Sequence, residues 1–340
     1  MHYRSIADMN DAIVRNLHRL PNDIDLVVGI PRSGILAANL FCLVTNIAMT
    51  DLDSFIEGRI YSSGNSAKRC STLDRDLTDM RRILVLDDSI RSGKAMRAAR
   101  ARLDAAGLGE KVMIGAVFGT STNHEEVDFV FEVVPDPRVF QWNLMHHVIL
   151  QKSCVDIDGV LCIDPTPAEN DDGPAYEKFL ADAFRLHVPT QRIGTLVTSR
   201  LEKYRRPTEA WLARHEIEYD TLVMLDLPSK AERQRLKAHG SFKAKVYRKS
   251  DALLFIESEP AQAEAIARLS GKPVFCVETQ QMISPDILSA AALQQQLRNL
   301  PSRLRQANPA GKKIKGLARS LLGQRGYLRL KSIVKSRTTK

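Results

Sequence analysis

The sequence is poor in cysteine and in aromatic residues, and it has no long apolar run. It holds five cysteines, and aromatic residues make up 6% of the chain. The cysteines show neither metal-ligand spacing nor a disulfide framework, which favours a reducing compartment. The longest apolar stretch, residues 35–49, is too short to cross a membrane, and residues 1–8 lack the apolar core of a signal peptide. We therefore expect a cytoplasmic protein.

Acidic residues are absent from the end of the chain. Residues 301–340 contain twelve Lys and Arg and no Asp or Glu. The whole chain has a formal net charge of +9, so subtracting twelve leaves −3 for residues 1–300. Leu and Ile recur at helical spacing between the basic residues, as in helices that lie on an anionic membrane. We expect a basic amphipathic helical tail. A disordered tail and a nucleic-acid arm are the alternatives, although Tyr327 is the tail's one aromatic residue, which counts against base stacking.

Length and composition permit two folded domains. The chain has 340 residues, of which 44% are hydrophobic and 26% charged, an ordinary globular composition. We detect no internal repeat, so two unlike domains are expected.

The first informative segment joins a predicted strand to two carboxylates. Residues 83–86 are apolar and read as a buried strand, Asp87 and Asp88 follow it, and an Ala/Arg-rich helical run begins after a short loop. Loop amides, a serine hydroxyl and a helix N-terminus bind phosphate, and carboxylates accept hydrogen bonds from ribose hydroxyls. The predicted ligand-binding residues of this segment are Asp87, Asp88, Ser89, Ile90, Arg91, Ser92, Gly93 and Lys94. The alternative is an ordinary buried strand with solvated acids at its end.

A second segment, residues 25–35, repeats the order strand, tight turn, helix. Its glycines allow the backbone to approach an anion closely, and Arg32 supplies positive charge. Residues 83–96 resemble the phosphoribosyl-diphosphate (PRPP) loop of type I phosphoribosyltransferases, with Ser92 where that family usually has Thr. Residues 25–35 resemble the diphosphate loop of the same family. The resemblance implies PRPP as substrate, with Arg32, Ser33 and Gly34 among its ligands and Asp87 and Asp88 in the catalytic site.

Residues 58–69 lie between these segments and are polar, glycine-containing and basic. We interpret them as a hood that closes over the diphosphate and excludes water, with an ordinary surface loop as the alternative. The identity of the general base stays open, since Asp87, Asp88 and the hood are all candidates.

A different carboxylate pattern begins at residue 153. A short predicted strand ends in Asp156, and Asp158, Gly159 and Val160 follow. Phosphoryl transfer through a covalent intermediate needs one carboxylate to attack phosphorus and a second to protonate the leaving oxygen. The pattern resembles motif I of the haloacid dehalogenase (HAD) phosphatase superfamily, which implies Asp156 as nucleophile and Asp158 as acid/base.

The next two HAD motifs follow in the family's order. Residues 193–200 read as a strand ending in two hydroxyl residues, and we prefer Thr198 to Ser199 as the one that holds a phosphoryl oxygen. The motif III lysine is Lys243 or Lys245.

The fourth motif supplies the metal ligands. Residues 253–259 form its predicted strand, but Ser258 stands where the family has Asp, so Glu257 or Glu259 must complete the site. The resemblance implies Mg²⁺ held by the carboxylates of Asp156 and Glu257 and by the backbone carbonyl of Asp158, and Mg²⁺ is also expected with PRPP. The alternative is a phosphatase domain that has lost its activity.

The order of the motifs predicts the organisation of the chain. We expect two doubly wound, Rossmann-like α/β domains with parallel sheets: a phosphoribosyltransferase domain at 1–147 and a HAD-like domain at 148–300, followed by the tail at 301–340. Residues 159–197 are too few for a large cap domain, so the phosphatase pocket should be open to a bulky substrate.

This order resembles that of bacterial ribofuranosyltransferase fusions. The resemblance implies transfer of ribose 5-phosphate from PRPP to a lipid-linked or oligosaccharide acceptor in O-antigen or capsule synthesis, followed by removal of the 5-phosphate. It also implies peripheral attachment to the inner membrane. A nucleobase phosphoribosyltransferase fused to a nucleotide phosphatase, or a PRPP-sensing regulator, are the alternatives. The acceptor sugar and the oligomeric state stay open.

Overall fold

The computed structural model describes residues 1–61, 80–236 and 238–285. Most of the expected hood (residues 62–69) and the whole tail (301–340) lie outside the described residues. No helix within the described ranges is both long and apolar enough to span a membrane.

The first sheet has five parallel strands. They lie in the order β3-β2-β4-β5-β6. Their bounds are β2 Ile24–Gly29, β3 Ala48–Asp51, β4 Arg82–Ile90, β5 Val112–Gly119 and β6 Phe129–Val133. The helices and turns around them are α1 Ile6–Asn16, η1 Leu17–Arg19, α2 Ser33–Thr45, α3 Leu52–Ile56, α4 Lys94–Ala105 and η4 Gly109–Lys111.

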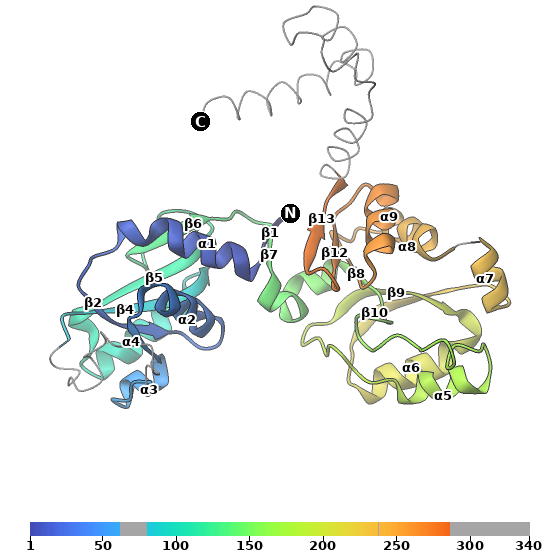
Figure 1. Ribbon diagram of the computed structural model, residues 1–340, viewed down its shortest axis with the longest axis horizontal. Helices are drawn as coiled ribbons and strands as arrows, with labels where there is room; N and C mark the ends of the chain where they lie inside the picture. Colours follow the sequence, from blue (N-terminus) through green and yellow to red (C-terminus); the bar gives the residue numbers. More distant parts are fainter. Residues whose placement is uncertain (62–79, 237, 286–340) are drawn as a thin grey trace, which may run out of the picture. The chain divides into compact units, whose positions relative to one another are not determined.

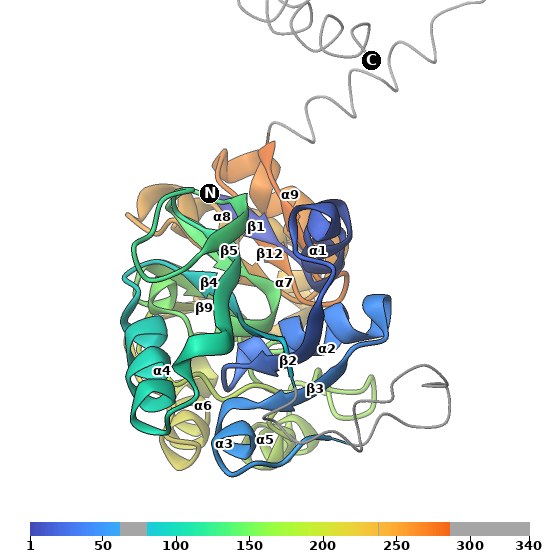
Figure 2. The ribbon, with the colours of Figure 1, turned by 90° about the vertical axis from the view of Figure 1, so that its left-hand side faces the viewer.

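Side-chain alternation along β4 divides the core of this domain into two layers. Leu84 and Leu86 pack with residues of α1 and α2, while Ile83 and Val85 pack with residues of α3 and α4. Figure 2 shows the same arrangement, with α4 on one side of the sheet and α1 and α2 on the other. A parallel strand covered on both faces is apolar at successive positions, which is the pattern that residues 83–86 show.

A separate two-stranded parallel ribbon joins the N-terminus to the segment that follows the first sheet. β1 (His2–Arg4) pairs with β7 (Arg138–Phe140), and the turns η5 (Gln141–His146) and η6 (Val148–Lys152) lead to the second sheet. α1 begins directly after β1, because Ser5 and Asp8 form a reciprocal capping box at its N-terminus.

The second sheet has six strands in the order β10-β9-β8-β11-β12-β13, all parallel except the β12–β13 pair. Its strands are β8 Ser153–Val155, β9 Ile193–Leu201, β10 Tyr219–Leu225, β11 Leu254–Glu257, β12 Val274–Cys276 and β13 Gln281–Ile283. Its helices and turn are α5 Pro174–Asp182, η7 Glu202–Tyr204, α6 Arg205–Arg214, α7 Lys230–Leu236, α8 Ala238–Lys249 and α9 Pro260–Ser270. α5 and α6 lie below β9 and β10 in Figure 1, and α8 and α9 lie above.

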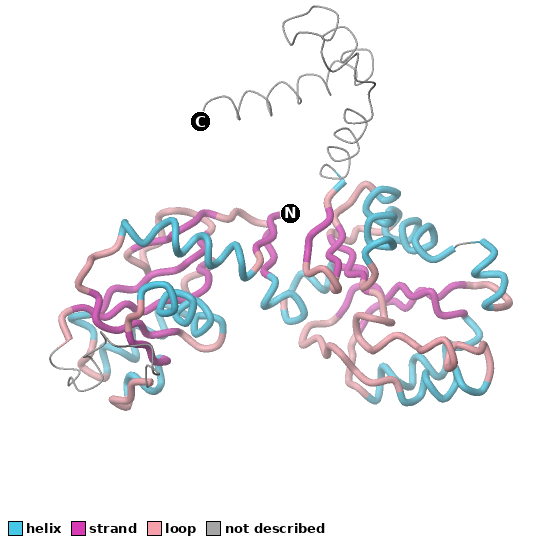
Figure 3. Tube along the Cα trace, in the orientation of Figure 1, coloured by secondary structure: helices cyan, strands magenta, loops and turns pink. Residues whose placement is uncertain are grey.

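Both sheets reverse their strand order at one place. The first sheet runs outward from β2 to β3 and then from β4 to β6, so the reversal lies between β2 and β4. The second sheet reverses between β8 and β11 in the same way. In open α/β sheets, ligands bind outside the carboxyl ends of the two strands at such a point. The expectation of mixed α/β domains with parallel sheets is confirmed, as the alternating strands and helices of Figure 3 show.

Candidate active sites

The carboxyl end of β4 holds two buried carboxylates, Asp87 and Asp88, which are 7% and 6% exposed. The Asp88 backbone amide donates to the Asp87 side chain at 2.8 Å. Burial, and next the negative charge of Asp88, raise the pKa of Asp87 well above its ordinary value. Two adjacent buried carboxylates need hydrogen-bond donors or cations as partners.

Both oxygens of Asp88 already have protein partners. The Ser33 hydroxyl donates to Oδ1 at 2.7 Å, and the Trp142 indole donates to Oδ2 at 2.8 Å. The Trp142 ring stacks on Phe140, with centroids 4.9 Å apart and planes inclined by 10°. Each carboxylate oxygen can accept a further hydrogen bond, so a ligand hydroxyl can bind Asp88 beside these donors.

Ser33 and Gly34 bring the two expected loops together. α2 begins at Ser33, and a Cβ at Gly34 would lie 2.7 Å from the Leu86 carbonyl oxygen and 2.9 Å from Asp87 Oδ1. Only glycine permits this close approach of β2's loop to the end of β4. Arg32 precedes α2 and is exposed. The residues predicted on two separate segments therefore meet at the reversal point of the first sheet.

The loop that the sequence predicts to bind phosphate is shorter than expected. β4 continues through Ser89 and Ile90, which pair with β5, so the prediction of a loop from Ser89 to Lys94 is wrong at both ends. α4 begins at Lys94, and only residues 91–93 form the connection. A strand buried on both faces continues as long as its neighbour does, and β5 extends to Gly119. Beyond Leu86, β4 pairs with β5 alone, and the Asp88 amide donates to the Asp87 side chain and not to a neighbouring strand.

The second sheet places a cluster of charged groups at its reversal point. The Lys243 ammonium donates to Asp156 Oδ2 at 2.6 Å, to Glu257 Oε2 at 2.9 Å and to Gln262 Oε1 at 3.1 Å. Burial raises the pKa of Asp156 well above its ordinary value, while Lys243 lowers it and Glu257 raises it. The pKa of Lys243 lies above its ordinary value because its two carboxylate partners outweigh the effect of burial. The positive charge of Lys243 thus offsets part of the free-energy cost of burying the carboxyl groups of Asp156 and Glu257.

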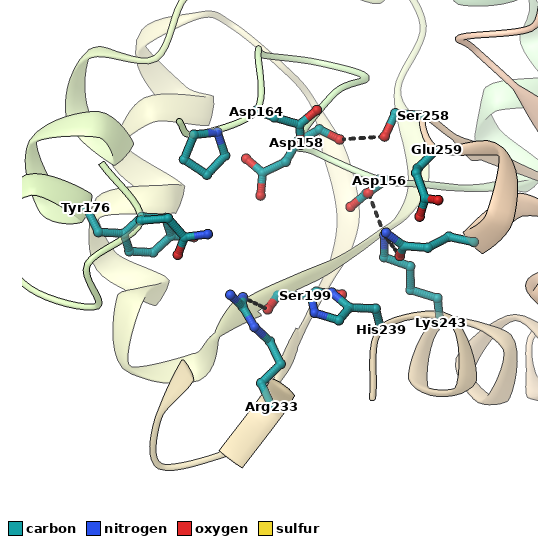
Figure 4. A pocket seen from close by; sticks show the side chains of 13 residues that line it. Asp156, Asp158, Asp164, Tyr176, Ser199, Arg233, His239, Lys243, Ser258 and Glu259 are labelled. Carbon is teal, nitrogen blue, oxygen red and sulfur yellow. Dashed lines mark hydrogen bonds and ion pairs between the residues drawn. The ribbon is translucent and has the colours of Figure 1, made fainter. Parts of the chain in front are cut away.

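A cavity of about 270 Å³ opens beside this cluster. Figure 4 shows Asp156, Lys243 and Glu259 along one side of it, with Tyr176 across from them and Arg233 beside Ser199. Arg233 Nη1 donates to the Ser199 carbonyl at 2.8 Å. The hydroxyl of Ser199 and the Nε of Arg233 are the only buried side-chain polar atoms in the described part of the chain that have no hydrogen-bond partner.

These orphaned atoms indicate a ligand rich in oxygen. A buried polar group without a partner costs about 1–3 kcal/mol, so two in one cavity wall call for a bound group that completes them. Both atoms can donate a hydrogen bond, and an anion accepts such bonds best. Ser199, Arg233 and Asp156 all line the cavity, and an anionic oxygen group bound there would accept from these two atoms after a small movement of their side chains.

Asp158 pairs with a buried arginine. Arg200 is fully buried, and it donates to Asp158 from Nε at 3.1 Å to each carboxylate oxygen and from Nη2 to Oδ1 at 2.6 Å. The pair fixes the orientation of the Asp158 carboxylate. Gly159 follows with φ +72°, and a Cβ there would lie 2.4 Å from Ser258, so this turn requires glycine.

Two of the residues expected to hold Mg²⁺, Asp158 and Glu257, are bridged by the Ser258 hydroxyl. The Ser258 hydroxyl donates to the Asp158 carbonyl at 3.3 Å and to Glu257 Oε1 at 3.4 Å. No three side chains of His, Cys, Asp or Glu converge on a metal position within the described residues. The expected set contains only two such side chains and a backbone carbonyl, and this all-oxygen set fits Mg²⁺.

The structure gives the candidate residues that are close in sequence different surroundings, while the role of the preferred Thr198 and that of Lys243 or Lys245 stay predictions. Ser199 lines the cavity, whereas Thr198 is fully buried outside its lining and accepts a hydrogen bond from the Arg200 amide. Lys243 lies in the cluster, whereas Lys245 is exposed on the same helix. The sequence gives no rule for these choices, because they depend on which face of a strand or helix meets the cavity.

Glu257 and Glu259 occupy different positions. Glu257 is fully buried and bonded to Lys243, while Glu259 lines the cavity and precedes α9.

Sequence reasoning missed four residues at these sites. They are Trp142, Arg200, Arg233 and Gln262. Arg200 directly follows the predicted motif II strand, and a charged residue at the end of a buried strand is the one signal that could have pointed to it. Trp142, Arg233 and Gln262 belong to other segments and reach the sites only through tertiary packing.

Similarity searches give limited guidance. No protein-family model matches the chain, and no curated protein matches it. Among solved structures, a xanthine-guanine-hypoxanthine phosphoribosyltransferase of Helicobacter pylori is 14% identical, with a TM-score of 0.30, over 42% of this chain and 92% of that one. A purine phosphoribosyltransferase from Pyrococcus horikoshii is 16% identical, with the same TM-score and the same coverage.

A chain in a structure of the Pnkp1/Rnl/Hen1 complex is similar over a longer part of the sequence. It is 17% identical, with a TM-score of 0.23, over 76% of this chain and 97% of that one. At these similarities the function has to be argued from the residues of the two sites.

Proposed function

We propose that the protein is a bifunctional ribofuranosyltransferase. Its first site would transfer ribose 5-phosphate from PRPP to a glycan acceptor, and its second site would remove the 5-phosphate. The observation that supports this most is that each sheet carries buried carboxylates at its reversal point, Asp87 and Asp88 on β4 and Asp156 after β8. Two such sites in one chain suit two successive reactions on one sugar phosphate.

The transfer step exchanges one bond at C1 of the ribose. The oxygen of an acceptor hydroxyl forms a bond to C1, the bond from C1 to the diphosphate breaks, and the diphosphate leaves with the electron pair. The hydroxyl proton would pass to the general base, for which Asp87, Asp88 and the hood are the candidates. Asp87 and Asp88 would accept hydrogen bonds from the ribose hydroxyls, while residues 91–93 and Arg32 would hold the phosphate groups. Ser33 would position Asp88 through the hydrogen bond that it donates.

The hydrolysis step is a double displacement at phosphorus. An Asp156 oxygen attacks the phosphorus, the sugar oxygen leaves and takes a proton, and water then cleaves the aspartyl phosphate to release inorganic phosphate. Lys243 would neutralise charge on Asp156, and Ser199 and Arg233 would donate to the phosphoryl oxygens. Asp158, held by Arg200, would give a proton to the leaving sugar oxygen and then take one from the attacking water. Bound Mg²⁺ would neutralise phosphoryl charge, held by Asp156, Glu257 and the Asp158 carbonyl.

A product assay tests both halves of this proposal. We would incubate the full chain with PRPP, Mg²⁺ and candidate glycan acceptors and follow the products by mass spectrometry. The expected product is the acceptor with one added pentose and no phosphate. With Asp156→Asn the added pentose should retain its phosphate, and with Asp88→Asn no pentose should be added. Fully dephosphorylated product from Asp156→Asn would rule out Asp156 as the nucleophile.

A nucleobase acceptor is the second candidate, and the aromatic stack beside Asp88 favours it. Trp142 is half-buried and donates a hydrogen bond to Asp88, while Phe118 and Phe140 pack beneath it in the core, and a partly exposed indole can stack on a planar base. The same assay with purines and pyrimidines in place of glycans distinguishes the two, because a nucleoside monophosphate or nucleoside would then appear.

A further inference from the structure

A second cationic cavity lies next to the loop that follows β4. Its volume is about 210 Å³, and it shares no lining residue with the phosphatase cavity. Arg91, Asp136, Arg138, His147 and Lys152 contribute its charged and titratable side chains. Arg138 belongs to β7, which Figure 1 shows in green just before the turns η5 and η6.

Positive charge in this cavity exceeds negative charge. Arg91 Nε lies 3.0 Å from Asp136, and Arg138 Nε lies 4.0 Å from the same carboxylate. Lys152 makes no ion pair with any of the described residues. One carboxylate therefore faces three cations.

Arg138 is the group that most needs a further partner. It is 6% exposed, and it donates to the Ile90 carbonyl at 2.8 Å and to the Val134 carbonyl at 3.5 Å. Burial lowers the pKa of its guanidinium, although the charges of Asp136 and Asp88 act to raise it. An anion in the cavity would offset more of the cost of burying this charge.

His147 adds a hydrogen-bond donor without adding charge. The Ile149 amide donates to its Nδ1 at 3.1 Å, so the ring proton lies on Nε2. Burial, and next the charges of Arg91 and Arg138, lower the pKa of His147, so the ring is neutral at physiological pH. Donors therefore predominate in the cavity, and a ligand there should present acceptor oxygens.

The position of the cavity connects it to the transferase site. Arg91 begins the short connection between β4 and α4, and Arg138 bonds the carbonyl of the last residue of β4. We propose that this cavity binds a phosphate or carboxylate group, and that the group belongs to the acceptor of the transferase. The first half of the proposal stands on the cavity alone, and the second half rests on the proposed transferase function.

Calorimetric binding to the full chain tests the anion site. The probes are inorganic phosphate and glucuronate, with glucose as the neutral match for glucuronate. We expect glucuronate to bind and glucose not to bind. Lys152→Gln should weaken glucuronate binding by at least about tenfold, which is the change in affinity expected from the loss of one charge-assisted hydrogen bond. Arg138→Gln should weaken it further. Lys245→Gln, an exposed lysine on α8 that does not line this cavity, is the matched control. Equal glucuronate binding by the wild type and Lys152→Gln would overturn the site.

Kinetics with matched acceptors test where the anion comes from. With PRPP as donor, an acidic oligosaccharide should have a lower KM than a neutral one of equal length, and Lys152→Gln should raise the KM of the acidic acceptor alone. If Lys152→Gln loses glucuronate binding but leaves the KM of both acceptors unchanged, the cavity binds a free anion and the acceptor assignment is wrong. If no acceptor reacts with wild type, the transferase function fails while the calorimetric result stands by itself.

Discussion

Asp87 shows what a single buried carboxylate costs the fold. Its pKa is higher in the folded chain than in the unfolded one, mainly through burial. The folded protein therefore binds this proton more tightly, and the stability linked to it is present below pH ~4 and is lost as the pH rises. Asp87→Asn should raise the free energy of unfolding at pH 7 by roughly 1 kcal/mol, with a gain that vanishes near pH 4, while transferase activity is lost. Urea unfolding of the wild type and Asp87→Asn at pH 7 and near pH 4 measures the change in the free energy of unfolding. An equal increase at both pH values would contradict the argument that burial raises the pKa of Asp87.

The Arg200–Asp158 pair makes a second prediction at the residue scale. Removing Arg200 leaves the Asp158 carboxylate, only 20% exposed, without its cation. Arg200→Met should therefore lower the free energy of unfolding by about 3 kcal/mol or more. Asp158→Asn together with Arg200→Met should recover part of that loss, because neither charge then remains. A double variant as unstable as Arg200→Met alone would show that the loss comes from packing around Arg200. Thermal unfolding of the wild type, of Arg200→Met and of the double variant distinguishes the two explanations.

At the scale of elements, α8 turns one lysine inward and another outward. Lys243 is buried between two carboxylates, while Lys245, two residues along the same helix, is exposed. Lys243→Met should lower phosphatase kcat by about 10²-fold or more, since it removes a cation beside the reacting phosphoryl group. Lys245→Met is the matched control and should leave kcat within twofold. Transfer from PRPP in both variants reports whether the rest of the chain is intact, and equal phosphatase loss in both variants would refute the role of Lys243.

At the scale of the whole molecule, residues 301–340 should bind the chain to anionic membranes. Each basic residue near the surface contributes about 1 kcal/mol, so binding should fall steeply with salt. A chain ending at residue 300 should stay folded and active on a soluble acceptor but lose activity on a lipid-linked one, because its local concentration at the membrane falls. Co-sedimentation with anionic vesicles at low and high salt measures binding. Equal sedimentation of both chains would favour the disordered-tail or nucleic-acid alternatives.

The sequence by itself determined the strands and the carboxylates that follow them. Residues 83–86 are apolar on both faces and Asp87 follows them, and Cys154 and Val155 precede Asp156 in a similar way. Local pattern was therefore enough to predict parallel strands with acids at their carboxyl ends. Bounds were less certain, and the loop after Asp88 was predicted too long because β4 pairs with β5 beyond it.

Tertiary structure alone decided which of two neighbouring side chains enters a site. Thr198 and Ser199 are both hydroxyl residues, and Lys243 and Lys245 are both lysines, so composition cannot separate them. Ser199 and Lys243 line the cavity because of the direction in which β9 and α8 present their side chains in the folded domain. The same holds for Trp142 and Arg138, which reach β4 from segments about fifty residues away along the chain. Their roles follow from strand order at the reversal points, where chain segments distant in sequence meet.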